Sequence, residues 1–280
     1  MCFGGVFMNY KLIATDLDGT LLYDVFTVSR ENFEAIAEYA AGGGYVVPTS
    51  GRCFLEIIPE LRECKDIRYC ISSNGAVITD LVTGERDEVA LSNKLFGDIM
   101  EITREYETYH TVHHRDKGYM LAENDSEEKA FYYNLNEHYF AHYHKWCVKL
   151  DNLESLYKNG LEAEMVSVFF KKQEQLDECA KRLEKLGGLV ITSSAPFNIE
   201  IVAEGASKGD GIARLAKKLG ISKGEIIGVG DSRNDLAMFE GVGLLLAVSN
   251  AVDELKNKAA RVICHHRDHI VKYILDNIIE

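Results

Sequence analysis

The sequence predicts an α/β protein: a Rossmann-like, three-layer α/β/α core with a parallel sheet, carrying an inserted α+β module. Three observations predict it. Short apolar runs alternate with helical patterns near both ends of the chain, and acidic motifs directly follow two of these runs. The middle of the chain instead combines amphipathic helical patterns with strands of alternating polarity. A chain of 280 residues is also long enough for a core with a second module.

The N-terminal part predicts alternating strands and helices. An apolar run over 11–15 is followed by helical spacing over 29–41, which Ser29 caps and the glycines at 42–44 end. The β-rich runs at 45–47 and 69–71 flank a second helix. Strands joined through helices are expected to pair in parallel.

The C-terminal part repeats this alternation. Its strands are nearly continuous apolar runs, as expected when helices cover both faces of a sheet. The expected elements are helix 209–219, strand 225–229, helix 234–240, strand 244–248 and helix 252–259. We therefore predict that residues 1–83 and 206–280 form one discontinuous core domain.

Residues 84–205 are predicted to form the inserted α+β domain. Helical patterns cover 92–107, 126–142 and 173–186, and alternating strands cover 165–170 and 198–202. Closure of this domain over the core would exclude water, and its loops would select the substrate.

Charge and cysteine content limit the function classes. A net charge of −13 without a basic stripe argues against a nucleic-acid surface. Seven cysteines, none in a CxxC pair, favour a reducing cytoplasm over a disulfide framework. No apolar run reaches the roughly 18 residues of a membrane span. Residues 1–7 are expected to be an upstream start or a frayed tail.

The strongest motif is Asp16-Leu17-Asp18-Gly19-Thr20-Leu21, directly after the first expected strand. Asp16 and Asp18 can point the same way at the carboxyl end of that strand, where open α/β sheets bind ligands. One carboxylate can attack phosphorus and the other can protonate the leaving alcohol, while a hard cation relieves their repulsion. An EF-hand loop is excluded, because Leu21 and Thr27 stand where glycine and glutamate are needed.

A second acidic motif covers 228–236 and again joins a strand to a helix. Arg233 occupies the place of the third glycine of a dinucleotide fingerprint, so Rossmann cofactor binding is not expected. Asp231 and Asp235 can complete the oxygen shell of the same cation, and Asn234 can donate a hydrogen bond to a phosphate.

Two smaller motifs supply donors and positive charge. Ser50-Gly51 stands at the tip of the second strand and opens a helix, where a hydroxyl and an amide can bind phosphate. Lys208 begins the helix that returns the chain to the core, and its ammonium can offset charge in a transition state. An anionic ligand on so acidic a protein requires such local positive charge.

These four motifs, in this order, resemble the haloacid dehalogenase (HAD) superfamily, and the layout is similar to its Cof-type (subfamily IIB) phosphatases with a large α+β cap. The resemblance covers the chain from Asn9 onward. It implies that Asp16 is the nucleophile and Asp18 the acid/base. The resemblance further implies two sets of binding residues: Mg²⁺ held by Asp16, Asp18, Asp231 and Asp235, and phosphate contacted by Leu17, Ser50, Gly51, Lys208 and Asn234.

The chain also matches secondary features of that family and departs from others. Matches lie at 73–76, 198–201 and 249–251. Ser50 stands where threonine is usual, Pro48 precedes the motif, and residues 265–269 replace the usual Asp-Gly-Val pattern. These departures affect loop shape more than chemistry.

The resulting hypothesis is a cytoplasmic, Mg²⁺-dependent phosphatase that hydrolyses small phosphomonoesters, either sugar phosphates or cofactor and nucleotide phosphates, through a phospho-aspartate. The alternatives are a phosphosugar mutase of the same fold, which would depend on a bisphosphate, and a catalytically silent phosphate-binding protein. The expected partner is a small phosphorylated metabolite, with no nucleic acid and no membrane, and the expected state is a monomer or weak homo-oligomer.

Substrate contacts are predicted less sharply than the core motifs. The candidates are Arg52, Asn74, His113, His114, Arg115 and Asn198. His138 and His142 stand one helical turn apart, but without a third ligand a surface pair is favoured over a metal site.

Overall fold

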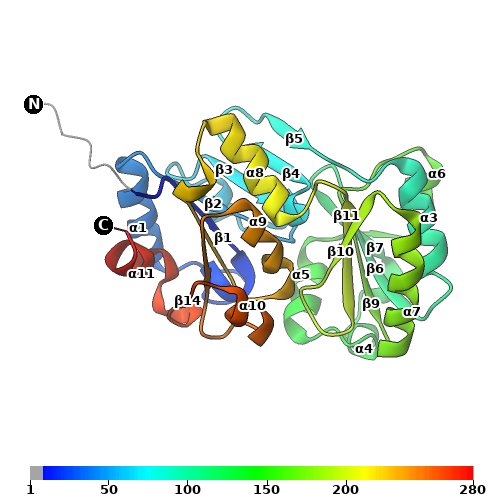
Figure 1. Cartoon of the computed structure of the whole chain (residues 1–280). Coiled ribbons are helices and arrows are strands. Elements are labelled where there is room, and N and C mark those ends of the chain that lie inside the picture. Colours follow the sequence, from blue (N-terminus) through cyan, green and yellow to red (C-terminus); the bar gives the residue numbers. More distant parts are fainter. Residues whose placement is uncertain (1–8, 280) are drawn as a thin grey trace, which may run out of the picture.

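A five-stranded parallel sheet forms the centre of the protein, in the order β14-β13-β12-β1-β2 (Figure 1). The computed structural model describes residues 9–279, so the expectations on residues 1–7 lie outside the described residues. Because β1 lies between β2 and β12, the two ends of the chain build one sheet. The strands are β1 (Leu12–Thr15), β2 (Tyr45–Pro48), β12 (Ile226–Gly230), β13 (Leu244–Ala247) and β14 (Arg261–Val262).

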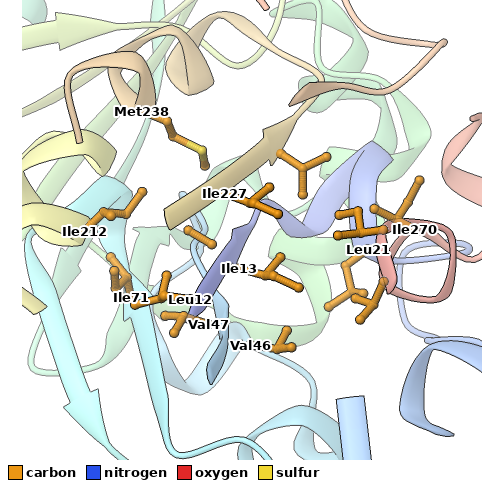
Figure 2. Close-up of a cluster of buried hydrophobic side chains, with 14 of the residues drawn as sticks. Leu12, Ile13, Leu21, Val46, Val47, Ile71, Ile212, Ile227, Met238 and Ile270 are labelled. Atoms are coloured by element: carbon orange, nitrogen blue, oxygen red, sulfur yellow. The ribbon is translucent and has the colours of Figure 1, made fainter. Parts of the chain in front are cut away.

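Helices cover both faces of this sheet and give the three layers. α1 (Arg30–Ala41) and α11 (Ile270–Asn277) lie on one side, α8 (Lys208–Leu219) and α9 (Met238–Gly241) lie on the other, and α10 (Asp253–Lys258) contacts β13 (Figure 1). Figure 2 shows Ile13 and Ile227 of the strands beside Ile270 and Met238 of the helices, all fully buried. Strands this apolar follow from coverage on both faces.

A short antiparallel sheet extends the first one. β3 (Tyr69–Ser72) joins β2 through one parallel bridge between Thr49 and Ile71, and α2 (Pro59–Arg62) precedes it. β4 (Val77–Asp80) pairs antiparallel with both β3 and β5 (Arg86–Glu88).

A separate six-stranded sheet, β10-β11-β9-β6-β7-β8, lies beside the first (Figure 1). α3 (Asn93–Thr103), α6 (Glu154–Lys158) and α7 (Gln173–Leu183) cover its outer side, whereas α5 (Glu137–Trp146) lies on the side of the parallel sheet, and α4 (Glu127–Tyr132) precedes it. The strands are β6 (Thr108–His114), β7 (Lys117–Leu121), β8 (Val148–Leu150), β9 (Met165–Phe170), β10 (Leu189–Thr192) and β11 (Asn198–Ala203).

The predicted fold class is confirmed, with local differences. The single helix predicted over 126–142 is two helices, because Asn134 takes a left-handed φ of 65° and Asn136 then caps a new helix at the Tyr139 N–H. The helix predicted over 92–107 ends at Thr103. Of the strands in the second sheet, the sequence predicts β9 and β11 but not the others. The domain boundaries stay a prediction: 83/84 falls between β4 and β5, and 205/206 between β11 and α8.

Candidate active site

Asp16 stands at the carboxyl end of β1, facing the end of β12. Its backbone N–H donates to the Val229 carbonyl at 2.9 Å, which continues the β1–β12 pairing to the start of the second acidic motif. Gly19 is required by the close approach of that motif: a Cβ there would lie 2.5 Å from an oxygen of Asp231, and its φ is +73°. The strand order therefore brings the two acidic motifs together, as the sequence predicted.

Lys208 joins these acids in a buried ion-pair cluster. Its Nζ lies 2.6 Å from Asp16 Oδ1 and 2.6 Å from Asp235 Oδ1, and the whole residue is only 1% exposed. The other oxygen of Asp235 accepts the backbone N–H groups of Asp231 and Ser232 at 2.9 and 3.0 Å. Asp235 thus holds both the lysine and the loop that carries Asp231.

The acids are arranged to hold a cation. Carboxylate oxygens of Asp16, Asp231 and Asp235 all lie within 4.8 Å of one another. Burial raises the pKa of Asp16 to about 7, and Asp235 and Asp18 add to the effect of burial against the opposing Lys208. Burial and the neighbouring Asp16 raise the pKa of Asp231 well above its usual range. Asp231 Oδ1 is buried without a hydrogen-bond partner among the described residues, so this hard-oxygen donor set fits Mg²⁺.

The predicted phosphate contacts lie around the same point. Ser50 and Gly51 line the cavity with Asp16, and Asn234 lines it from the second acidic motif. The Asn234 amide donates to Asn74 Oδ1 at 3.0 Å, which fixes it beside Gly51. The Leu17 side chain is buried in the hydrophobic core, so only its backbone can reach a phosphate.

Asp18 is turned away from this cluster and bound by Arg52. Two parallel contacts join them, Nε–Oδ2 at 2.8 Å and Nη2–Oδ1 at 2.6 Å, and His138 Nε2 lies 2.9 Å from Oδ1. Burial alone would raise the pKa of Asp18, but Arg52 and His138 outweigh it and hold that pKa well below its usual value. Asp18 is therefore an ionised acceptor in this arrangement.

The cavity above Asp16 has a volume of about 270 Å³. Residues from the parallel-sheet side and from the six-stranded-sheet side both line it. Of the predicted substrate contacts, Arg52 and His113 line it. Asn74 lies behind Gly51, where its amide donates to Glu200 at 2.6 Å, and Asn198 is buried and donates to Ser167 Oγ at 3.0 Å. His114 and Arg115 line a different cleft, because alternation along β6 turns His114 away from His113 and Arg115 begins the turn to β7.

His138 and His142 are not the surface pair that the sequence favoured. His142 is buried, and its Nε2 lies 3.1 Å from Glu56 Oε2, while His138 contacts Asp18. Their spacing of four residues was the available signal, since both lie on the face of α5 that covers the cavity.

Sequence reasoning missed several cavity residues altogether. Glu56 lies in the turn after Arg52, Tyr139 and Tyr143 lie on α5, and Ser194 follows β10. None of them belongs to a recognisable motif. Glu200 was noted as part of 198–201 but given no role. Only the fold brings these residues to one cavity.

The protein belongs to the family of haloacid dehalogenase-like hydrolases, whose sequence model matches residues 13–275. Within that family it is a Cof-type phosphatase, and therefore a phosphoric monoester hydrolase. Within residues 9–279, none of the helices combines the length and apolarity that a membrane crossing needs.

Individual relatives agree with this assignment. The chain is 30% identical to the 5-amino-6-(5-phospho-D-ribitylamino)uracil phosphatase YwtE of Bacillus subtilis, over 96% of this chain and 98% of that one. A solved haloacid dehalogenase-like hydrolase from B. subtilis has a TM-score of 0.82 at 28% identity, covering 96% of this chain and 99% of the other. The subclass IIB sugar phosphatase BT4131 has a TM-score of 0.78 at 20% identity, covering 95% and 98%, and shows the shared fold.

Proposed function

We propose that the protein is a Mg²⁺-dependent phosphatase that hydrolyses small phosphomonoesters through a phospho-aspartate on Asp16. The observation that carries the proposal is the cluster of Asp16, Asp231 and Asp235 around the buried Lys208 ammonium. Asp16, Asp231 and the backbone carbonyl of Asp18 would hold the ion, with Asp235 as support. The bound ion would supply charge neutralisation for the phosphoryl oxygens.

In the first half-reaction, Asp16 attacks phosphorus in line with the ester oxygen. A bond forms between the carboxylate oxygen and phosphorus, the P–O ester bond breaks, and the leaving alkoxide takes a proton from Asp18. Lys208 stays beside Asp16 and stabilises the charge that develops on the equatorial oxygens, while Ser50, Gly51 and Asn234 orient the phosphate.

In the second half-reaction, Asp18 accepts a proton from water, which attacks the phospho-aspartate and releases phosphate. The ionised Asp18 paired with Arg52 has the protonation state that this step needs. Proton donation in the first step requires Asp18 to separate from Arg52, since that pair favours the carboxylate. The Arg52–Asp18 pair is thus expected to open and close in each cycle.

Sugar, cofactor and nucleotide phosphates remain the substrate candidates. The relatives named as 5-amino-6-(5-phospho-D-ribitylamino)uracil phosphatases add that phosphorylated ribityl compound to the list. We place the protein in the cytoplasm, because the six cysteines of the described residues are all unpaired. The monomer or weak homo-oligomer stays a prediction.

A phosphate-release screen across these compounds with Mg²⁺ tests the proposal. We expect release by the wild type and a loss of at least about 10³-fold in Asp16→Asn, which keeps the size but removes the nucleophile. Asp151→Asn, an exposed cap position, is the matched control and should retain activity. Equal release by wild type and Asp16→Asn would reject Asp16 as nucleophile, and dependence on an added bisphosphate with little release would favour the mutase.

A further inference from the structure

We infer that the end of the cavity away from Asp16 selects alcohols that are uncharged or cationic and rejects those that carry a second negative group. The inference rests on the proposed phosphatase function and concerns the leaving group alone. It follows from the charges that the two ends of the cavity hold.

Two buried carboxylates line the cavity in addition to the aspartates of the two acidic motifs. Glu56, from the turn after β2, is 1% exposed, and Glu200, from β11, is 4% exposed. Neither belongs to the four core motifs. Glu56 follows Arg52 closely in the chain, whereas Glu200 lies beside Gly51 and Asn234.

Both carboxylates are held by hydrogen-bond donors other than lysine or arginine. Glu56 Oε2 accepts the Cys53 N–H at 3.2 Å and lies 3.1 Å from His142 Nε2, and Cys147 Sγ donates to its other oxygen at 3.5 Å. Burial and the nearby Arg52 lower the pKa of His142, against the opposing effect of Glu56. His113 Nε2 lies 3.8 Å away. Although burial alone would raise it, His142, His113 and the Cys53 N–H bring the pKa of Glu56 to about 2.

Glu200 has a similar environment. Its Oε2 accepts the Asn74 amide at 2.6 Å and lies 3.5 Å from the Asn234 amide, and its Oε1 accepts the Ser194 hydroxyl. These donors satisfy the oxygens but bring no positive charge.

Arg52 is the one lysine or arginine among the described residues that line the cavity, and it is already engaged. Its guanidinium binds Asp18 through two contacts and donates to the Val25 and Glu56 carbonyls at 2.8 and 3.2 Å. Lys208 lies at the other end, bound to Asp16 and Asp235. A second phosphate or carboxylate on the substrate would therefore have to compete with Asp18 for Arg52, because no other lysine or arginine of the described residues lines the cavity.

The two ends of the cavity consequently differ in net charge. At the phosphate end, three carboxylates face Lys208 and, in the proposed enzyme, a divalent cation. In the rest of the cavity, Asp18 and Glu56 lie close to Arg52, and Glu200 adds a third carboxylate beside Gly51. The histidines His113, His138 and His142 also line it. Like charges brought together in a partly buried site repel strongly, whereas hydroxyl groups can hydrogen-bond to the carboxylates, Asn136 and Tyr139. A polyol or sugar suits this end, and an amino sugar suits it better.

Matched substrates test the inference on the wild-type protein. Sorbitol 6-phosphate and 6-phosphogluconate differ at one carbon, which carries a hydroxyl in the first and a carboxylate in the second. We expect kcat/KM to be about ten- to a hundred-fold higher for sorbitol 6-phosphate. We also expect glucosamine 6-phosphate to equal or exceed glucose 6-phosphate. Equal or better hydrolysis of 6-phosphogluconate would overturn the inference while leaving the phosphatase assignment intact.

Charge-removing variants locate the effect. Glu56→Gln and Glu200→Gln should each reduce the preference for sorbitol 6-phosphate by about three- to ten-fold, with Glu60→Gln, an exposed position four residues from Glu56, keeping the wild-type ratio. If folded Glu56→Gln and Glu200→Gln proteins keep a strong preference for sorbitol 6-phosphate, these two residues do not cause it. If a variant fails to fold, the wild-type substrate pairs still decide.

Binding separates this inference from the proposed chemistry. If no phosphomonoester is hydrolysed, the proposed function fails, but calorimetric titration of Asp16→Asn with the same two compounds still compares the pocket's affinity for each. Tighter binding of sorbitol 6-phosphate would support the charge selection, and equal or weaker binding would overturn it.

Discussion

The two ends of the active-site cavity are built in different ways. At the phosphate end, aspartates from the ends of β1 and β12 surround one buried lysine, and each comes from a short contiguous motif. At the leaving-group end, Glu56, His142 and Glu200 come from a core turn, α5 and β11, and no motif connects them. In the proposed enzyme the chemistry would therefore be carried by adjacent strand ends, whereas substrate selection would depend on how the two sheets pack together.

Removing Lys208 should break the phosphate end. Lys208→Met leaves Asp16 and Asp235 without their shared cation, so we expect kcat to fall by about 10² to 10³ and the fold to lose about 3 kcal/mol or more. Steady-state kinetics and urea denaturation measure the two effects. Lys217→Met, exposed on the same helix, is the control. Retention of activity by Lys208→Met would show that this ammonium is not needed.

Weakening the Arg52–Asp18 pair should lower the activity and change its dependence on pH. Arg52→Lys keeps the charge but loses the two parallel contacts, so we expect kcat/KM to fall by about ten- to a hundred-fold. Because Arg52 holds the pKa of Asp18 well below its usual range, the substitution should raise that pKa and move the acid limb of the pH–rate profile to higher pH. Arg30→Lys, an exposed helix position, should leave the profile unchanged, and an unmoved limb in Arg52→Lys would argue against this coupling.

Mg²⁺ should stabilise the phosphate end in a pH-dependent way. Without metal, burial raises the pKa of Asp16 from 3.8 to about 7, so the folded state binds protons better than the unfolded state does. Stability of the metal-free protein should then fall as pH rises from about 4 toward 7. At 100 times its Kd, Mg²⁺ should restore about 2.7 kcal/mol above pH 7.

Thermal unfolding with and without Mg²⁺ measures this effect. Asp231→Asn should lose most of the gain, because it removes one of the carboxylates that would hold the ion. An unchanged Tm at pH 8 on adding Mg²⁺ would contradict the assigned metal site.

A smaller effect is expected where the cap packs on Glu56. A Cβ on Gly118 would lie 2.1 Å from Glu56 Oε1 and 2.9 Å from Cys147 Sγ, so Gly118→Ala should cost about 1–3 kcal/mol of stability. Gly224→Ala, whose Cβ meets nothing within 4 Å, is the control. Denaturant midpoints for the two variants measure the difference, and equal midpoints would show that the contact is easily relieved.

The same contrast explains what the sequence predicts and what it does not. Asp16 and Asp231 could be paired in advance, because strands joined through helices align their carboxyl ends at one edge of a sheet. Lys208 could be placed because it begins the helix that follows the cap. The fold class followed from the alternation of apolar runs and helical patterns at the two ends of the chain.

No such rule places the residues at the leaving-group end of the cavity. Glu56 belongs to no periodic pattern in the sequence. Its position depends on the space that Gly118 of β7 leaves open. The sequence pattern of His142 is that of a surface histidine, and only the packing of α5 on the core turn brings it to Glu56. The helix predicted over 126–142 failed for a related reason, since the left-handed Asn134 interrupts a pattern that is otherwise helical.

The most direct test of the account is to trap the covalent intermediate. Protein mixed with a hydrolysed substrate and Mg²⁺, then quenched in acid, should yield one phosphorylated peptide on mass spectrometry, with the phosphate on Asp16. The Asp16→Asn protein should yield none. Phosphate on a different residue, or substantial turnover by Asp16→Asn, would contradict the account.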